Sequence, residues 1–183
     1  MPEQYATVIL LCEDRQQQTF VYRYLRHKGV NPRRIRTLTS PAGSGSGEHY
    51  VRQEYPKQVA AIRAKSYLRV GLVAVLDADT HDVSTRHRQL DESLTQAKQE
   101  ARGSNEAIAL VVPRRNIETW IHFLRGTPVN EVDRYAKLTE PSACEDAVRE
   151  FATRCPGSIR PESPPSLSVG CDELTRFLEF VKK

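Results

Sequence analysis

Four short apolar runs divide the first two-thirds of the chain, at residues 8–12, 35–38, 72–76 and 107–112. Most of them are continuous and have no helical stripe, which is typical of strands buried on both faces of a parallel sheet. Segments with helical spacing separate the runs, and strands that alternate with helices favour right-handed parallel crossovers. The pattern therefore predicts an α/β, Rossmann-like fold with a mainly parallel central sheet flanked by helices.

The predicted helices carry apolar residues three or four positions apart. In the second predicted helix, which contains Val51, Tyr55, Val59 and Ile62, Pro56 must either kink the helix or start its main segment. Beyond Gly126 the character of the chain changes, and a Pro/Ser-rich link at 156–168 separates two further helices. We expect residues 1–126 to form the α/β domain and residues 127–183 to form a helical extension packed on it, within a single structural domain. Predicted helices include residues 16–27, 84–102, 117–124 and 141–154.

Acidic residues directly follow two of the predicted strands. Asp77 and Asp79 lie in the stretch LVAVLDADTHD, and Glu13 follows the strand at 8–12. Side chains at i and i+2 of an extended segment project to the same side, about 6 to 7 Å apart, so both aspartates can face one divalent cation. If the two strands are parallel neighbours, Glu13 meets the aspartates at the strand ends, where open α/β sheets bind ligands. The sequence therefore predicts one acidic site.

A strand that ends in Glu, followed by a later strand that ends in Asp-x-Asp, resembles the TOPRIM domain of topoisomerases, DnaG-type primases, small ribonucleases and OLD-family nucleases. The similarity covers roughly residues 8–124. The stretch PRRNIETW also looks like the P-x-x-x-I-E-x-W stretch of small TOPRIM-like proteins from bacterial defence and OLD-related groups. By this resemblance, Glu13 performs general acid/base work, Asp77 and Asp79 coordinate magnesium, and Glu118 is an extra acidic ligand.

Carboxylates suit magnesium because this ion prefers oxygen ligands and keeps several waters. We expect Mg²⁺ as the cofactor, with Mn²⁺ able to substitute. Its predicted ligands are Glu13, Asp77, Asp79 and Glu118, with Asp82 as a possible outer ligand, and these residues could hold one or two ions.

Structural roles remain open for several of these residues. Asp79 and Asp82 could simply cap the following helix, and Glu13 could lie in a first helical turn, where the helix dipole favours acids. Arg115, in contrast, has the chemistry to bind the scissile phosphate through two hydrogen bonds. We therefore predict Glu13, Asp77, Asp79 and Arg115 as the catalytic residues.

The predicted function is hydrolysis of phosphodiester bonds in DNA or RNA, in phage defence or nucleic-acid processing. OLD-related TOPRIM nucleases often work with an ATPase domain, and this chain contains no Walker motif. A separate ATPase subunit is therefore an expected partner, and a homo-oligomer is compatible with the sequence.

Two alternatives are open. Most TOPRIM domains have a Gly two residues after the Glu, where this chain has Arg15, which favours a TOPRIM-like regulatory or assembly subunit without turnover. The segment LDADT also matches the D-x-D-x-T motif of haloacid-dehalogenase-type phosphatases, with Asp77 as nucleophile. That family needs a later lysine and a downstream acidic pair after another strand. Here Lys98 precedes the next strand, and no clear acidic pair follows Val112.

Composition narrows the class of protein. The 183 residues suit one domain, and no segment is long and apolar enough to span a bilayer. The N-terminus has no basic leader, so we expect a cytoplasmic protein without a membrane partner. The four cysteines show no C-x-x-C pair and are predicted to be reduced.

Two further segments could bear on substrate binding. The net charge of +4 is mild, but six basic residues lie between positions 23 and 36 and could track a phosphate backbone. They could equally form a solvated helix face and turn. Residues 40–47 (SPAGSGSG) lack the lysine and spacing of a P-loop, and we expect them to form a mobile loop over the active site.

Overall fold

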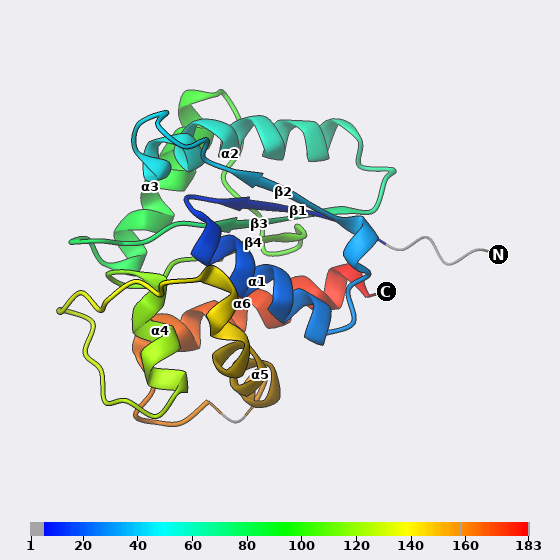
Figure 1. Ribbon diagram of the computed structural model, residues 1–183. Coiled ribbons are helices and arrows are strands. Elements are labelled where there is room, and N and C mark those ends of the chain that lie inside the picture. The colour runs from blue at the N-terminus through cyan, green and yellow to red at the C-terminus, as the bar shows by residue number, and fades with distance from the viewer. Residues whose placement is uncertain (1–5, 158, 183) are drawn as a thin grey trace.

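A four-stranded parallel sheet lies at the centre of the computed structural model, which describes residues 6–157 and 159–182. The strands are β1 (Thr7–Cys12), β2 (Ile35–Thr39), β3 (Val70–Val75) and β4 (Ile108–Val111), in the order β2-β1-β3-β4. Helices cover both faces of the sheet, so the α/β, Rossmann-like prediction is confirmed (Figure 1). All three strand pairs are parallel, so the carboxyl ends of the four strands lie at the same end of the sheet.

The helices form two layers. Helices α2 (Gly47–Ala64) and α3 (Val83–Gln96) cover one face, and α1 (Arg15–His27), α4 (Ile117–Leu124), α5 (Glu145–Arg154) and α6 (Pro165–Val181) cover the other (Figure 1). Successive strand residues alternate between the two hydrophobic clusters, as pleating requires: Leu10 packs with the α1 side and Leu11 with the α2 side. Strand β2, at one edge of the sheet, is more exposed than β4 at the other edge, which α6 covers.

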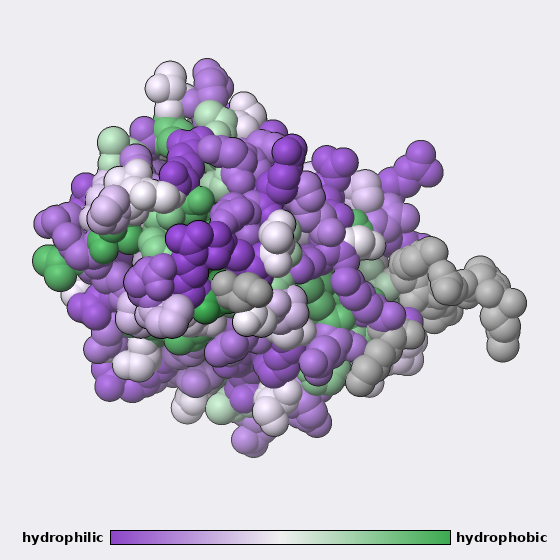
Figure 2. Space-filling view, turned by 90° about the horizontal axis from the view of Figure 1, so that it is seen from below, coloured by the Kyte–Doolittle hydropathy of each residue, from purple (hydrophilic) through white to green (hydrophobic). Residues whose placement is uncertain are grey.

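The C-terminal helices complete the layer that contains α1. Helix α5 packs on α1 and α4, and α6 packs on β4 and β3. An aromatic cluster of Phe20, Tyr24, Trp120 and Phe151 joins α1, α4 and α5, with Phe20 and Phe151 ring centroids 5.8 Å apart. The outer surface seen from this side is mainly hydrophilic, with hydrophobic residues in separate patches (Figure 2). None of the helices in the described residues is long and apolar enough to cross a membrane.

Several helix boundaries differ from the predictions. Helix α5 begins at Glu145 after a 3-10 turn at Pro141–Cys144, and α6 begins at Pro165, inside the segment that was predicted to be a link. Helix α2 begins at Gly47, where Ser46 caps it by accepting a hydrogen bond from the His49 amide, and it continues through Pro56. The prediction that Pro56 could start the main segment was therefore wrong. Helix α3 ends at Gln96 instead of residue 102, because Lys98 turns into the left-handed region with a φ of 58°.

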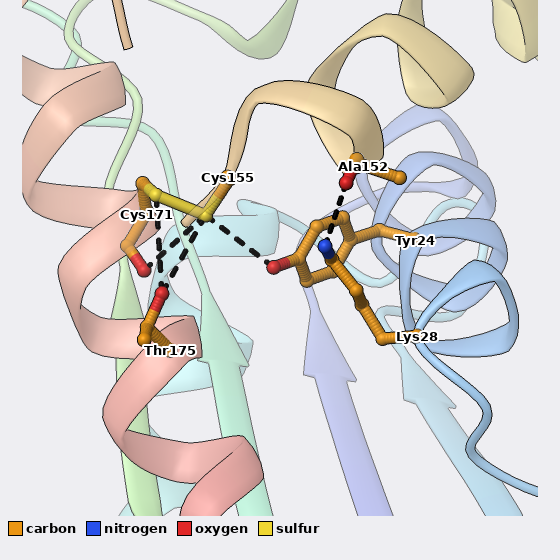
Figure 3. The surroundings of a disulfide bond; sticks show 6 residues. All are labelled: Tyr24, Lys28, Ala152, Cys155, Cys171 and Thr175. Carbon is orange, nitrogen blue, oxygen red and sulfur yellow. Dashed lines mark hydrogen bonds between the residues drawn. A yellow bond between two sulfur atoms is a disulfide. The ribbon is translucent and has the colours of Figure 1, made fainter. Parts of the chain in front are cut away.

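The prediction of four reduced cysteines was also wrong. Cys155, after α5, forms a disulfide with Cys171 of α6, with their Cα atoms 5.7 Å apart. The hydroxyl of Tyr24 donates a hydrogen bond to Cys155 Sγ at 3.4 Å, and Thr175 lies beside both sulfurs (Figure 3). Spacing along the chain could not indicate this bond, since it depends on the link folding back to bring α6 beside the end of α5. Cys12 and Cys144 are buried free thiols.

Candidate functional site

Two predicted acidic segments meet where β1 and β3 end. Cys12 pairs with Val75 in the parallel register, so the residues that follow each strand emerge together. The Asp77 amide donates a hydrogen bond of 2.8 Å to Glu13 Oε2, across 64 positions of sequence. Strand β1 lies between β2 and β3, and the helices that follow β1 and β3 leave on opposite faces. This is the crevice where ligands bind in open α/β sheets.

Gln17, a buried residue in the first turns of α1, holds Glu13 in place. Its Nε2 donates to Glu13 Oε2 at 2.9 Å, and its Oε1 accepts from the Glu13 amide at 3.0 Å. Asp14 caps the same helix by accepting from the Gln17 amide. Glu13 therefore precedes the helix rather than lying in its first turn, and its Oε1 has no hydrogen-bond donor among the described residues.

Asp77 and Glu118 are buried carboxylates with unmet hydrogen-bonding capacity. Asp77 is 7% exposed and Glu118 is 1% exposed. Asp77 Oδ1 and Glu118 Oε1 are both buried without a hydrogen-bond partner in the part of the chain that the structure describes. Such oxygens are costly unless they meet a proton, a water or a cation.

The pKa values of these acids are raised by their surroundings. Burial raises the pKa of Glu13 from 4.5 to about 7, and the charges of Asp79 and Asp14 act in the same direction. Burial also raises the pKa of Asp77, helped by the charges of Glu13 and Asp14, and burial raises the pKa of Glu118. The three carboxyls therefore favour bound protons or a bound cation near neutral pH.

Asp79 and Arg115 connect the loops that follow β3 and β4. Both adopt the left-handed backbone conformation, with φ values of 52° and 67°, and they face each other in an isolated antiparallel bridge. Arg115 Nη1 donates to the Asp79 carbonyl oxygen at 3.4 Å, while the Asp79 carboxylate remains partly exposed. Backbone conformations of this kind cost energy in residues other than glycine and cluster at functional sites.

The remaining predicted ligand, Asp82, has the contacts of a helix cap. Its carboxylate accepts hydrogen bonds from the Thr85 amide at 2.7 Å and the Ser84 hydroxyl at 2.9 Å, at the start of α3. These bonds lower the pKa of Asp82 to about 2. The structure therefore brings Glu13, Asp77, Asp79 and Glu118 to this end of the sheet and gives Asp82 its alternative role.

The first turn of α2 packs directly against Glu13. A Cβ atom at Gly47 would lie 2.8 Å from the Glu13 carbonyl oxygen, so only glycine fits this approach without a shift. The glycine-rich segment at 40–46 leads into this turn. Its end therefore lies beside the acidic site, and its expected mobility remains a prediction.

Arg86 is a residue of this region that the sequence analysis missed. It is 5% exposed, and its Nε donates to the Asp77 carbonyl oxygen at 3.1 Å. Its Nη2 lies 3.4 Å from Asp79 Oδ2, and its Nη1 lies 2.7 Å from Glu48 Oε1. A single arginine on a polar helix carries no signal in the sequence, because only the fold brings it under the loop.

A surface cavity of about 190 Å³ adjoins the acids, and Asp14, Arg15, Glu118 and Lys137 are among its lining residues. Lys137 comes from the segment between α4 and α5. Its positive charge lowers the pKa of Glu118, against the larger effect of burial. The cavity therefore places cationic side chains beside the carboxylates.

The basic residues between positions 23 and 36 divide into two groups. Arg23 pairs with Glu145 at 3.0 Å and Lys28 donates to the Ala152 carbonyl oxygen, so both help to attach α5. The others are exposed: Arg26, Arg33, Arg34 and Arg36. A role for them in binding a phosphate backbone remains a prediction.

The chemistry of the acidic site fits magnesium better than its present geometry does. All its candidate ligands are carboxylates, and two of them have buried oxygens without partners. Within residues 6–157 and 159–182, however, no three His, Cys, Asp or Glu side chains are already arranged around a common metal position. The donor set suits the ion, and the carboxylates would have to turn toward it.

Comparison of this chain with protein-family models, with curated proteins and with solved structures gave no match. The function therefore has to be inferred from the residues of the site.

Proposed function

We propose that this protein is a magnesium-dependent nuclease of the TOPRIM type that hydrolyses phosphodiester bonds in DNA or RNA. The observation that carries the proposal is the hydrogen bond from the Asp77 amide to Glu13 Oε2, which joins the ends of β1 and β3. Around this bond, Asp77 Oδ1 and Glu118 Oε1 are buried without a hydrogen-bond partner among the described residues, and burial raises the pKa of both carboxyls. A cation bound there would contact the unpaired oxygens and would stabilise the ionised carboxylates.

Each residue of the site has a chemical role in this proposal. Asp77, Asp79 and Glu118 would hold the metal through carboxylate oxygens. The bound ion would neutralise charge on the phosphoryl oxygens and lower the pKa of a water molecule. Arg115 would bind the phosphate, since a guanidinium can donate two parallel hydrogen bonds to it.

Glu13 is suited to act as the general base. Its Oε2 already accepts hydrogen bonds from the Asp77 amide and from Gln17, so Oε1 is the oxygen that can take a proton from the attacking water. A pKa of about 7 is close to the value at which a general base is most effective near neutral pH.

The proposal extends to the setting of the reaction. We expect the protein to act in the cytoplasm on nucleic acid, in phage defence or nucleic-acid processing, together with a separate ATPase subunit. Recovery of an ATPase with the tagged protein from its native host would support this last point, and repeated recovery without one would count against it.

One observation favours a second candidate, a TOPRIM-like regulatory or assembly subunit without turnover. Across the described residues, the acidic side chains are not already arranged around a metal position. A subunit of this kind would retain the acids as part of its fold and would bind no catalytic ion.

Cleavage assays with Mg²⁺ or Mn²⁺ distinguish the two candidates. The substrates are supercoiled plasmid, single-stranded DNA and tRNA, and the variants are Asp77→Asn and Glu13→Gln, both checked for folding. Glu92→Gln is the matched control, because Glu92 lies on the exposed side of α3 and pairs only with Arg88 at 3.6 Å in the described structure. Cleavage lost in both site variants and kept in the control would support the nuclease. Absence of cleavage by wild type, with no Asp77-dependent metal binding in calorimetry, would favour the assembly subunit.

A further inference from the structure

Arg86 is a buried charged side chain that contacts both Asp77 and Asp79 of the acidic site. The loop after β3 offers it two oxygens: the Asp77 carbonyl at 3.1 Å from Nε and the Asp79 carboxylate at 3.4 Å from Nη2. On the other side, Nη1 donates to Glu48 Oε1 at 2.7 Å and to Gln89 Oε1 at 2.8 Å. One guanidinium therefore joins the loop, α2 and α3.

Glu48 connects this arrangement to Glu13. It is the second residue of α2, directly after Gly47, whose backbone packs against Glu13. An acid in the first helical turn is favoured by the helix dipole, and Glu48 also pairs with Arg52 at 3.1 Å. The first turn of α2 thus touches the end of β1 through Gly47 and the loop after β3 through Glu48 and Arg86.

We propose that Arg86 is a positioning residue of the acidic site, which fixes the Asp77 backbone and the Asp79 carboxylate for metal binding and is itself held by Glu48. The proposal rests on the proposed function for the identity of the metal. Arg86 acts through the two aspartates and does not bind the substrate, because it is 5% exposed and its donors face protein oxygens.

The chemistry of arginine explains why this residue type occupies the position. The planar guanidinium has five donors in a fixed arrangement, so it can reach a carbonyl and two carboxylates in different directions at once. Lysine offers a single nitrogen and would keep the positive charge without spanning the same three acceptors. The loop at Asp79 needs such support, since its backbone is in the left-handed conformation.

The test compares Arg86→Gln and Arg86→Lys with wild type. Arg88→Gln is the matched control, because Arg88 is on the same helix but is exposed and pairs with Glu92. Mg²⁺ affinity is measured by calorimetry, and amide hydrogen exchange of residues 76–82 is measured in the metal-free protein. Glu48→Gln serves as a second variant, since it weakens the support of Arg86 and leaves the arginine in place should Arg86→Gln fail to fold.

We expect Arg86→Gln to lower Mg²⁺ affinity by about 10-fold or more, as is common for residues that orient metal ligands. Arg86→Lys should lie between that variant and wild type, and the control should match wild type. Amides of residues 76–82 should exchange faster in Arg86→Gln, while those of β1 and β4 stay protected. In cleavage assays the Mg²⁺ concentration for half-maximal rate should rise while KM for nucleic acid stays unchanged.

Wild-type Mg²⁺ affinity and unchanged exchange in Arg86→Gln would overturn the proposal and leave the nuclease proposal intact. If wild type binds no Mg²⁺, the nuclease proposal fails instead, and hydrogen exchange alone then decides the positioning role. Faster exchange confined to residues 76–82 would support that role, and unchanged exchange would overturn it.

Discussion

Replacement of Glu13 by glutamine should stabilise the metal-free protein above neutral pH. Burial, the largest cause, raises the pKa of Glu13 from 4.5 to about 7 in the folded state. The folded protein thus binds this proton more tightly than the unfolded chain, and wild type loses stability as pH rises from 4.5 through 7. The difference between the two pKa values corresponds to about 3 kcal/mol of folding free energy.

Glutamine removes the charge and can keep the contacts. Its Oε1 can accept the two hydrogen bonds that Glu13 Oε2 receives from the Asp77 amide and from Gln17. Loss of the Glu13 charge also removes one of the causes that raise the pKa of Asp77, so the effect on Asp77 has the same sign. The variant should therefore match wild type near pH 4.5 and exceed its stability by about 3 kcal/mol at pH 8.5.

Urea unfolding in EDTA at several pH values between 4.5 and 8.5 measures this difference. Glu92→Gln is again the control, because this side chain is 57% exposed and its removal should leave the pH dependence unchanged. A Glu13→Gln variant that is no more stable than wild type at pH 8.5, or a stability difference that does not vary with pH, would refute the reasoning.

Three further predictions concern the same protein. Gly47→Ala should lower the free energy of unfolding by about 1 to 3 kcal/mol, because the alanine Cβ would lie 2.8 Å from the Glu13 carbonyl oxygen. An unchanged thermal midpoint would contradict this close packing. Mg²⁺ at 100 times its dissociation constant should raise the unfolding free energy by about 2.7 kcal/mol at pH 8.5, and by much less at pH 5, where protons compete for the carboxylates. An equal effect of Mg²⁺ on the Asp77→Asn variant would show that the ion binds elsewhere. Reduction of the Cys155–Cys171 bond, whose cysteines are 16 positions apart, should cost about 3 kcal/mol in urea unfolding, and equal midpoints with and without reductant would contradict it.

The sequence predicted the fold and the meeting of the acids for the same physical reason. Continuous apolar runs identify buried parallel strands, and in such a sheet the residues that follow neighbouring strands emerge at one edge. Glu13 and Asp77 could therefore be brought together from their positions alone. The roles of Gln17 and Arg86 could not, because polar residues on helices have no distinguishing pattern until the packing of those helices is known.

The role of Asp82 could not be decided and the disulfide was missed, because both depend on contacts that the sequence pattern does not show. Asp82 had two chemically sensible roles in the sequence, and its contacts with Ser84 and Thr85 are those of the helix cap. The disulfide depends on the path of the chain between α5 and α6, which cysteine spacing does not encode. The predicted ligands, the metal and the nuclease activity remain predictions.

The Cys155–Cys171 bond has a consequence for how the protein would respond to a protease. The link between α5 and α6 contains Glu162, whose side chain is 62% exposed, and the two cysteines flank this site. A cut after Glu162 by a glutamate-specific protease would therefore break the backbone without releasing α6. The nicked molecule would migrate as one species on a non-reducing gel and as two fragments after reduction.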